Sequence, residues 1–115
     1  MTGVQTCALP IYFWAENPGR DDYVLIKFDK PTSVEEVFVE TGCHRAKNDM
    51  LKAAELQASF EPVEGDSCGN FETFDTFTGG KAKISLDKSK EVVCLRILVT
   101  QAQTEWVYLR EIDVW

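Results

Sequence analysis

The feature that most constrains the fold is a series of short apolar runs, spaced roughly ten residues apart and separated by turn-forming residues. Val24, Ile26 and Phe28 occupy every second position of one run, the period of a strand with one buried face. Strands are predicted over residues 23–28, 34–41, 71–77, 83–86, 91–100 and 106–115, with turns at 29–33 and 79–80. This pattern predicts an all-β fold, specifically a jelly-roll β-sandwich.

Two segments need separate treatment. Residues 50–58 combine helical propensity with a length that also suits a strand, and from the residues alone both interpretations stay open. In the last predicted strand the alternation breaks at Arg110 and Glu111, which indicates a β-bulge.

Length and charge exclude several classes of protein. A chain of 115 residues forms one domain and is too short for a Rossmann dehydrogenase or a TIM barrel. The 19 acidic and 12 basic residues give a net charge of −7, which argues against nucleic acid and anionic lipid as partners. Because no apolar run approaches the roughly 20 residues of a membrane span, we expect no membrane contact either.

The first eleven residues read Met-Thr-Gly-Val-Gln-Thr-Cys-Ala-Leu-Pro-Ile. They resemble a translated sequencing-library adapter with GTG taken as the start codon, so residues 1–11 are expected to be non-native and are set aside. The domain is then expected to occupy residues 12–115 and to be truncated at its N-terminus. A preceding strand would complete the sheet, and without it one sheet edge is expected to lie open.

Setting Cys7 aside leaves three cysteines. Cys94 lies in the apolar run 92–95, where a free buried thiol is expected. Cys43 and Cys68 lie in loop-like sequence and can pair in an oxidising compartment. Three thiols and one histidine without C-x-x-C spacing predict no metal site.

No residue pattern predicts catalysis. Residues 65–69 match G-x-S-x-G, but a nucleophile elbow needs a preceding strand, a following helix and a downstream histidine. Here Pro62 precedes the motif, and the single histidine, His44, lies upstream of it. We therefore predict no catalytic residue in this chain.

The polar loop of residues 42–49 and the three tryptophans are the candidates for a binding site. The loop is either a solvated connection or a sugar or anion site, because its Asp, Asn, Arg and His side chains can hydrogen-bond hydroxyls. Trp106 follows a polar segment and is equally suited to the core or to stacking on a sugar. Trp14 and Trp115 are expected in the core.

Several segments resemble the C-terminal domain of the alpha-1,3-mannosyl-glycoprotein 4-beta-N-acetylglucosaminyltransferases. Residues 12–15 read Y-F-W-A and residues 22–31 read D-Y-V-L-I-K-F-D-K-P, close to the family's F-F-W-A and G-D-Y-I-L-F-K-F-D-K-P. Residues 77–82 (F-T-G-G-K-A) resemble its F-x-N-G-x-A, and residues 106–112 (W-V-Y-L-R-E-I) resemble its W-A-I-L-N-E-I. The resemblance implies that residues 50–58 form a strand.

The resemblance also implies a fold and a function. The family's domain is a lectin-like β-sandwich, similar to galactose-binding and discoidin modules, that recognises N-acetylglucosamine-bearing N-glycans. It assists a separate upstream transferase domain in the Golgi lumen, which uses UDP-N-acetylglucosamine and a divalent cation. This segment itself is expected to need no cofactor. The alternative is a structural β-sandwich of a secretory-pathway protein that has lost ligand binding.

Carried over residue by residue, the resemblance implies a glycan site on three segments. The implied site residues are Trp14, His44, Arg45, Asn48, Asp49 and Trp106. The family's H-P-G-D is replaced by Lys47-Asn48-Asp49, with His44 displaced, so the match is firmest at Asp49.

Overall fold

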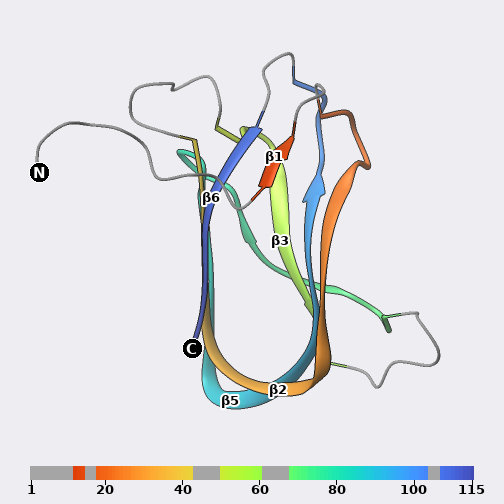
Figure 1. Ribbon diagram of the computed structural model, residues 1–115, viewed down its shortest axis with the longest axis vertical. Coiled ribbons are helices and arrows are strands. Elements are labelled where there is room, and N and C mark those ends of the chain that lie inside the picture. Colours follow the sequence, from red (N-terminus) through yellow and green to blue (C-terminus); the bar gives the residue numbers. More distant parts are fainter. Residues whose placement is uncertain (1–11, 15–17, 43–49, 61–67, 104–106) are drawn as a thin grey trace, which may run out of the picture.

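The computed structural model describes residues 12–14, 18–42, 50–60, 68–103 and 107–115 (Figure 1). These residues form six antiparallel strands: β1 (Tyr12–Trp14), β2 (Tyr23–Thr41), β3 (Ala54–Ser59), β4 (Glu72–Thr76), β5 (Lys81–Val99) and β6 (Val107–Val114). Their order in the sheet is β1-β6-β2-β5-β3-β4. The described ranges contain no helix, and so none long and apolar enough to cross a membrane. The prediction of an all-β fold is confirmed.

The sandwich arises because β2 and β5, each 19 residues long, bend together and pass from one layer into the other (Figure 1). The first layer contains β1, β6, the second half of β2 and the first half of β5. The second layer contains the first half of β2, the second half of β5, β3 and β4. One continuous sheet therefore supplies both faces of the core.

The bend corrects the prediction of a turn at residues 29–33: residues 23–28 and 34–41, predicted as two strands, form one, and so do residues 83–86 and 91–100. Strands β2 and β5 both remain extended through the bend, because a bulge in each strand accommodates the curvature. On β2 the residues between Lys27 and Thr32 lie opposite Val93 alone. On β5 the residues between Ser85 and Lys90 lie opposite Glu35 alone. The turn-forming residues 29–33 therefore lie where β2 passes from one layer to the other, and the chain does not reverse its direction there.

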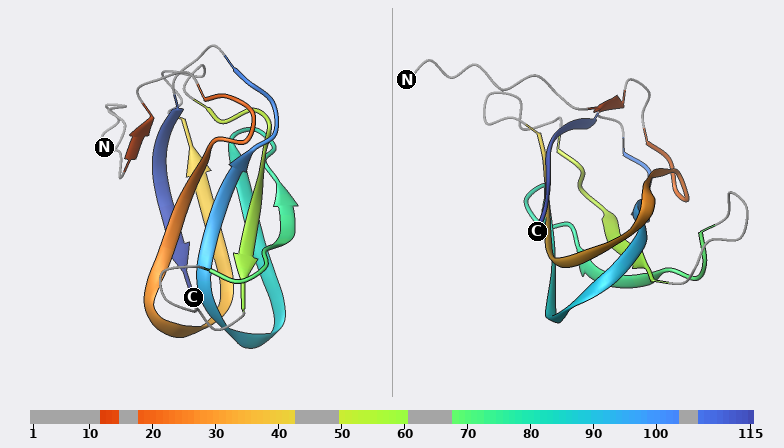
Figure 2. Two further views of the ribbon diagram at one scale, coloured as in Figure 1. Left: turned by 90° about the vertical axis from the view of Figure 1, so that its right-hand side faces the viewer. Right: turned by 60° about the horizontal axis from the view of Figure 1, so that its bottom comes forward.

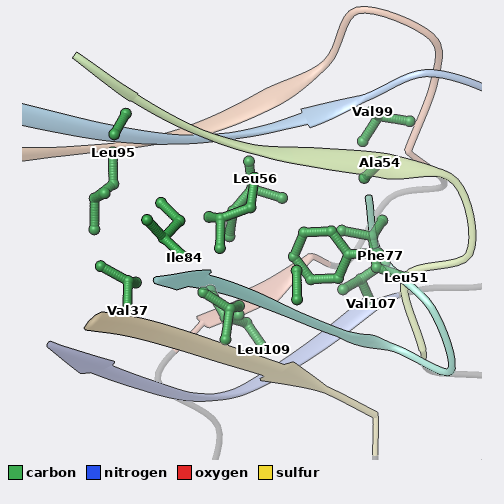
Figure 3. Packing of buried hydrophobic residues seen from close by; sticks show 14 of the residues in the cluster. Val37, Leu51, Ala54, Leu56, Phe77, Ile84, Leu95, Val99, Val107 and Leu109 are labelled. Atoms are coloured by element: carbon green, nitrogen blue, oxygen red, sulfur yellow. The ribbon is translucent and has the colours of Figure 1, made fainter. Parts of the chain in front are cut away.

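The core lies between the two layers (Figure 3). Val37 and Ile84 face it from the first layer, and Leu56, Leu95 and Ile97 face it from the second. The fully buried apolar side chains are mostly aliphatic and β-branched, which suits packing between twisted sheets. In Figure 3 Phe77, Leu51 and Val107 lie together at one end of this core. The short alternating runs of the sequence thus become the two inner faces.

Two further predictions are confirmed. Of the predicted strand 50–58, residues 54–58 lie in β3 despite the segment's helical propensity, because Ala54, Leu56 and Ala58 fill the core face of the sheet beside β5, whereas residues 50–53 precede the strand. The bulge in β6 is also present. Glu40 of β2 pairs with Glu111, and the next residue, Thr41, pairs with Leu109, which leaves Arg110 without a partner in the register.

The cysteine prediction is wrong for Cys94. This residue is buried, as expected, but it forms a disulfide with Cys68, with a Cα–Cα distance of 6.2 Å. Alternation explains the error. Cys94 pairs with Lys27 and Ser59 on the outer face of the second layer, whereas its neighbour Leu95 faces the core. Cys43 lies outside the described residues, and its pairing with Cys68 is excluded by this disulfide.

Candidate functional site

Thr41, at the end of β2, ties three segments together at one end of the sandwich. Its buried hydroxyl donates a hydrogen bond to the Gly80 carbonyl (2.7 Å) and accepts one from the Leu51 amide (2.9 Å). The Thr41 amide also donates to the Gly80 carbonyl (2.8 Å). The end of β2, the approach to β3 and the turn before β5 are therefore held at one point.

The chain leaves β2 through Gly42, whose φ of +81° is a conformation that other residues rarely adopt. A Cβ atom at this position would lie 2.2 Å from Cγ of Met50. The two residues that flank 43–49 are thus packed directly against each other, and a glycine is required for that contact.

Gln103 links the approach to β3 to the segment that contains Pro18. Its side-chain oxygen accepts a hydrogen bond from the Lys52 amide (3.0 Å), and its side-chain nitrogen donates to the Met50 carbonyl (3.1 Å). Its backbone amide donates to the carbonyl of Pro18 (3.0 Å). Only 8 % of Gln103 is exposed, so these bonds form in a shielded environment where each is difficult to replace.

Backbone pairing between β1 and β6 places β1 at the same end of the sandwich as Thr41 and Gln103. Trp14 on β1 is the register partner of Val107 on β6, and Val107 directly follows Trp106 in the sequence. Gln103 and Val107 flank residues 104–106, as Gly42 and Met50 flank 43–49 and Trp14 and Pro18 flank 15–17. We call these flanking residues the loop stems.

Five of the six predicted site residues belong to segments that the loop stems bound, and the sixth, Trp14, is itself a loop stem. His44, Arg45, Asn48, Asp49 and Trp106 lie outside the described residues, and Trp14 is described in its backbone alone. The structure therefore brings together the stems of the two segments that carry five predicted residues, 43–49 and 104–106, and the strand that carries Trp14. Their side-chain geometry stays a prediction.

Sequence reasoning missed the two residues that hold the stems. Thr41 could have been recognised, because it continues the inward-facing series of Val37 and Val39 with a polar side chain. Gln103 gives no such signal, since it stands in the polar segment 101–105 like an ordinary loop residue. For Trp115 the prediction of a core position is wrong: 72 % of this residue is exposed.

A second polar cluster lies on the outer face of the second layer. Arg96 donates to the Gln57 side-chain oxygen (2.7 Å), and its guanidinium lies 4.1 Å from the Phe71 ring centroid. The side-chain nitrogen of Gln57 donates hydrogen bonds to the Glu55 carboxylate and the Thr73 hydroxyl, at 3.0 Å each. Because these groups satisfy one another, the cluster is best explained as a link between strands. Over the described ranges no group of three or more His, Cys, Asp or Glu residues could hold a metal ion.

Replacing Gln103 with leucine is expected to destabilise the domain by about 1–3 kcal/mol, because the Lys52 amide and the Met50 carbonyl lose their buried partner. Urea denaturation monitored by tryptophan fluorescence measures the change. The matched control is Gln101→Leu at an exposed position two residues earlier, which should change stability by less than about 0.5 kcal/mol. Equal effects of the two variants would contradict the anchoring role of Gln103.

Two solved chitosan-binding modules have a similar architecture. Chitosan-binding module 2 of a Paenibacillus sp. IK-5 chitosanase/glucanase, solved in complex with chitotriose, aligns with a TM-score of 0.63 and 19 % sequence identity. That alignment covers 90 % of this chain and 76 % of that chain. Module 1 of the same enzyme aligns with a TM-score of 0.59 and 17 % identity, covering 86 % and 74 % of the two chains. These likenesses agree with a lectin-like β-sandwich fold.

Two relatives by sequence are N-acetylglucosaminyltransferases. An alpha-1,6-mannosyl-glycoprotein 4-beta-N-acetylglucosaminyltransferase of Gallus gallus is 34 % identical over 108 residues. The alpha-1,3-mannosyl-glycoprotein 4-beta-N-acetylglucosaminyltransferase C of Mus musculus is 28 % identical over 110 residues. Each alignment covers 90 % of this chain and 23 % of the relative, so the chain spans about a quarter of their length. The family model described as the MGAT4 C-terminal domain matches residues 10–111, and the chain belongs to that family.

Proposed function

We propose that this domain binds N-glycans, through N-acetylglucosamine, as the glycan-recognising module of a transferase that branches N-glycans. The observation that carries the proposal is the convergence of the loop stems around Thr41 and Gln103. Membership of the MGAT4 C-terminal domain family supports it, as does the likeness to a module solved with chitotriose.

The proposed site uses the six residues that the sequence predicted. Asp49 accepts hydrogen bonds from sugar hydroxyls, Asn48 both accepts and donates them, and His44 and Arg45 add donors. Trp106 covers the apolar face of the sugar, with Trp14 beside it. The hydrogen-bonded stems would hold these segments in place, which lowers the ordering cost of binding a weak ligand.

The whole protein is proposed to act in the Golgi lumen. A separate catalytic domain would use UDP-N-acetylglucosamine and a divalent cation, and this module would present the glycan to it. The disulfide between Cys68 and Cys94 supports the location, because structural disulfides persist in oxidising compartments and are rare in the cytosol.

Asp49→Ala is the sharpest test of the site. Shallow single-sugar sites bind with a Kd of about 1 mM, or about −4 kcal/mol. Loss of a charge-assisted hydrogen bond worth about 1.5–3 kcal/mol should raise Kd more than tenfold and abolish detectable binding. Titration of the full chain with N-acetylglucosamine-terminated glycans, followed by NMR chemical shifts, measures this.

Two controls make the result specific. Asp29→Ala removes an exposed carboxylate from the bulge of β2 between Lys27 and Thr32, and should leave binding unchanged. The bend of β2 lies at the other end of the sandwich from the loop stems (Figure 1). Mannose-terminated glycans should produce smaller shifts than N-acetylglucosamine-terminated ones. Shifts that cluster away from Asp49 and Trp106 would refute this site. Absence of shifts with either glycan would favour the structural alternative.

A further inference from the structure

The first half of β2, residues 23–28, forms one side of the second layer. In Figure 2 (left) β2 and β4 lie on the two sides of this layer, with β5 and β3 between them. Residues 23–27 pair with β5, whereas β6 pairs with β2 only at residues 37–41. Among the described strands none pairs with the other side of residues 23–28, which is therefore an open edge.

Other edges of the sandwich are protected against further pairing. The Asp75 carboxylate on β4 accepts a hydrogen bond from the Lys83 amide (2.8 Å), on the side of β5 that faces away from β2. β1 has only three residues, and charged residues follow the part of β6 that pairs with it: Arg110, Glu111 and Asp113. Short strands and charged side chains are the usual protection of a sheet edge. Residues 23–28 are longer than β1 and contain one charged residue, Lys27.

This edge is apolar on both of its faces. On the outer face Leu25 is 43 % exposed, and Tyr23 is 56 % exposed although its ring lies 5.9 Å from the Arg96 guanidinium. On the inner face Val24 and Ile26 pack against the core but remain partly exposed, whereas their partners on β5 are fully buried. The apolar surface on both faces is thus incomplete at this side of the layer, as it would be where a neighbouring strand is missing.

We propose that in the whole protein this edge pairs with a strand from the segment that precedes residue 12, antiparallel like every described pair of the sheet. Residues 1–11 are taken as non-native, as the sequence indicates. The chain matches a C-terminal domain and spans about a quarter of two relatives, so upstream chain is available in them. The chitosan-binding module also extends beyond its alignment, which covers 76 % of that chain.

The position of the edge favours this occupant. β1 is the outermost strand of the first layer, and in Figure 2 (left) it lies on the same side of the sandwich as the first half of β2. Chain that leads into β1 therefore reaches the open edge without crossing either layer, as connections in sandwiches normally do. A segment of the same chain also has an effective concentration in the millimolar range, so one short strand suffices to hold it.

The consequence is a change in the domain boundary. The β-sandwich would begin upstream of residue 12, and the preceding part of the protein would be attached to it through a paired strand as well as through the chain. A second copy is a poorer occupant, because the net charge of −7 makes two copies repel each other. This inference does not depend on glycan binding, since residues 23–28 lie outside the loop stems.

A fusion protein tests the proposal. Residues 1–11 are replaced by about 40 residues that directly precede the aligned region in the Gallus gallus relative, enough for a strand and its connections. Amide hydrogen exchange followed by NMR should slow at least tenfold at alternate residues of 23–28, because every second amide of an edge strand points away from its existing partner. The amides of residues 72–76 on β4 are the internal control and should be unchanged.

A pair of matched variants tests the burial that the added strand provides. Ile26→Ala should lower the urea midpoint about twice as much in the fusion as in the original chain, because the side chain is more deeply buried there. Ile112→Ala is the control: it truncates an isoleucine that is partly buried against the same core, on β6 of the first layer, and should have equal effects in both proteins.

A synthetic peptide with the sequence of the added segment gives a second measurement if the fusion does not fold. Titrated into the original chain, it should shift the NMR resonances of residues 23–28. Slower exchange at residues 72–76 instead, equal effects of Ile26→Ala in the two proteins, or no response of 23–28 to either the fusion or the peptide would each overturn the proposal. Exchange at 23–28 that slows with the concentration of the original chain, and no further in the fusion, would assign the edge to a second copy.

Discussion

Removal of the Cys68–Cys94 disulfide should lower the free energy of unfolding by about 3.5 kcal/mol. The disulfide joins residues 26 apart in sequence, and closing a loop of that length removes this much conformational freedom from the unfolded chain. The loss is a large share of the ~5–15 kcal/mol that stabilises an ordinary domain. The double variant Cys68→Ala/Cys94→Ala is the right one, because a single substitution leaves a thiol that can exchange with other cysteines.

The measurement is urea denaturation of both proteins with and without a thiol reductant. The reductant should destabilise the original chain toward the double variant and should affect the double variant much less. Ser89→Ala, at an exposed position of β5 before the disulfide, serves as the control and should change stability by less than about 0.5 kcal/mol. If the original chain and the double variant unfold at the same urea concentration, the disulfide contributes no stability.

Leu56→Ala should cost about 3–5 kcal/mol, the largest effect expected of a single substitution in this domain. Leu56 is completely buried on β3, where it faces the core beside Ile97 of β5. Its truncation removes apolar contacts with both layers and leaves a cavity that two hydrogen-bonded sheets cannot easily close.

Thermal and urea unfolding of the purified variant measure this cost. Ile97→Val, which removes one methylene group from the neighbouring core position, should cost about 0.5–1.5 kcal/mol and gives a graded comparison. Val114→Ala at a partly exposed position of β6 should cost less than either. A Leu56→Ala effect no larger than that of Val114→Ala would mean that the two layers do not share one core.

The arrangement divides the protein's tasks between its two ends. At the bend, β2 and β5 change layer and hold the sandwich together through paired backbones. At the other end, buried side chains of Thr41 and Gln103 fix the stems of the segments proposed to bind sugar. Rigid stems beneath variable loops are a common way for a sandwich to position a binding surface.

The sequence by itself determined most of the extended segments and several of their inward-facing residues. Alternation in 23–28 and 34–41, the turn at Gly79 and Gly80, and the bulge at Arg110 were all predictable, because each depends on residues close together in the chain. The resemblance of residues 12–15, 22–31 and 106–112 to a known family predicted the lectin-like fold and identified residues 50–58 as a strand.

Only the tertiary structure decided which segments meet. The bend at residues 29–33, the disulfide of Cys94 and the role of Gln103 each depend on a partner far away in the sequence. A turn motif in one chain does not show that a second strand bends with it, and an apolar run does not show which of its residues faces outward. Contacts of this kind arise from the packing of one layer on the other, and local propensity contains no information about that packing.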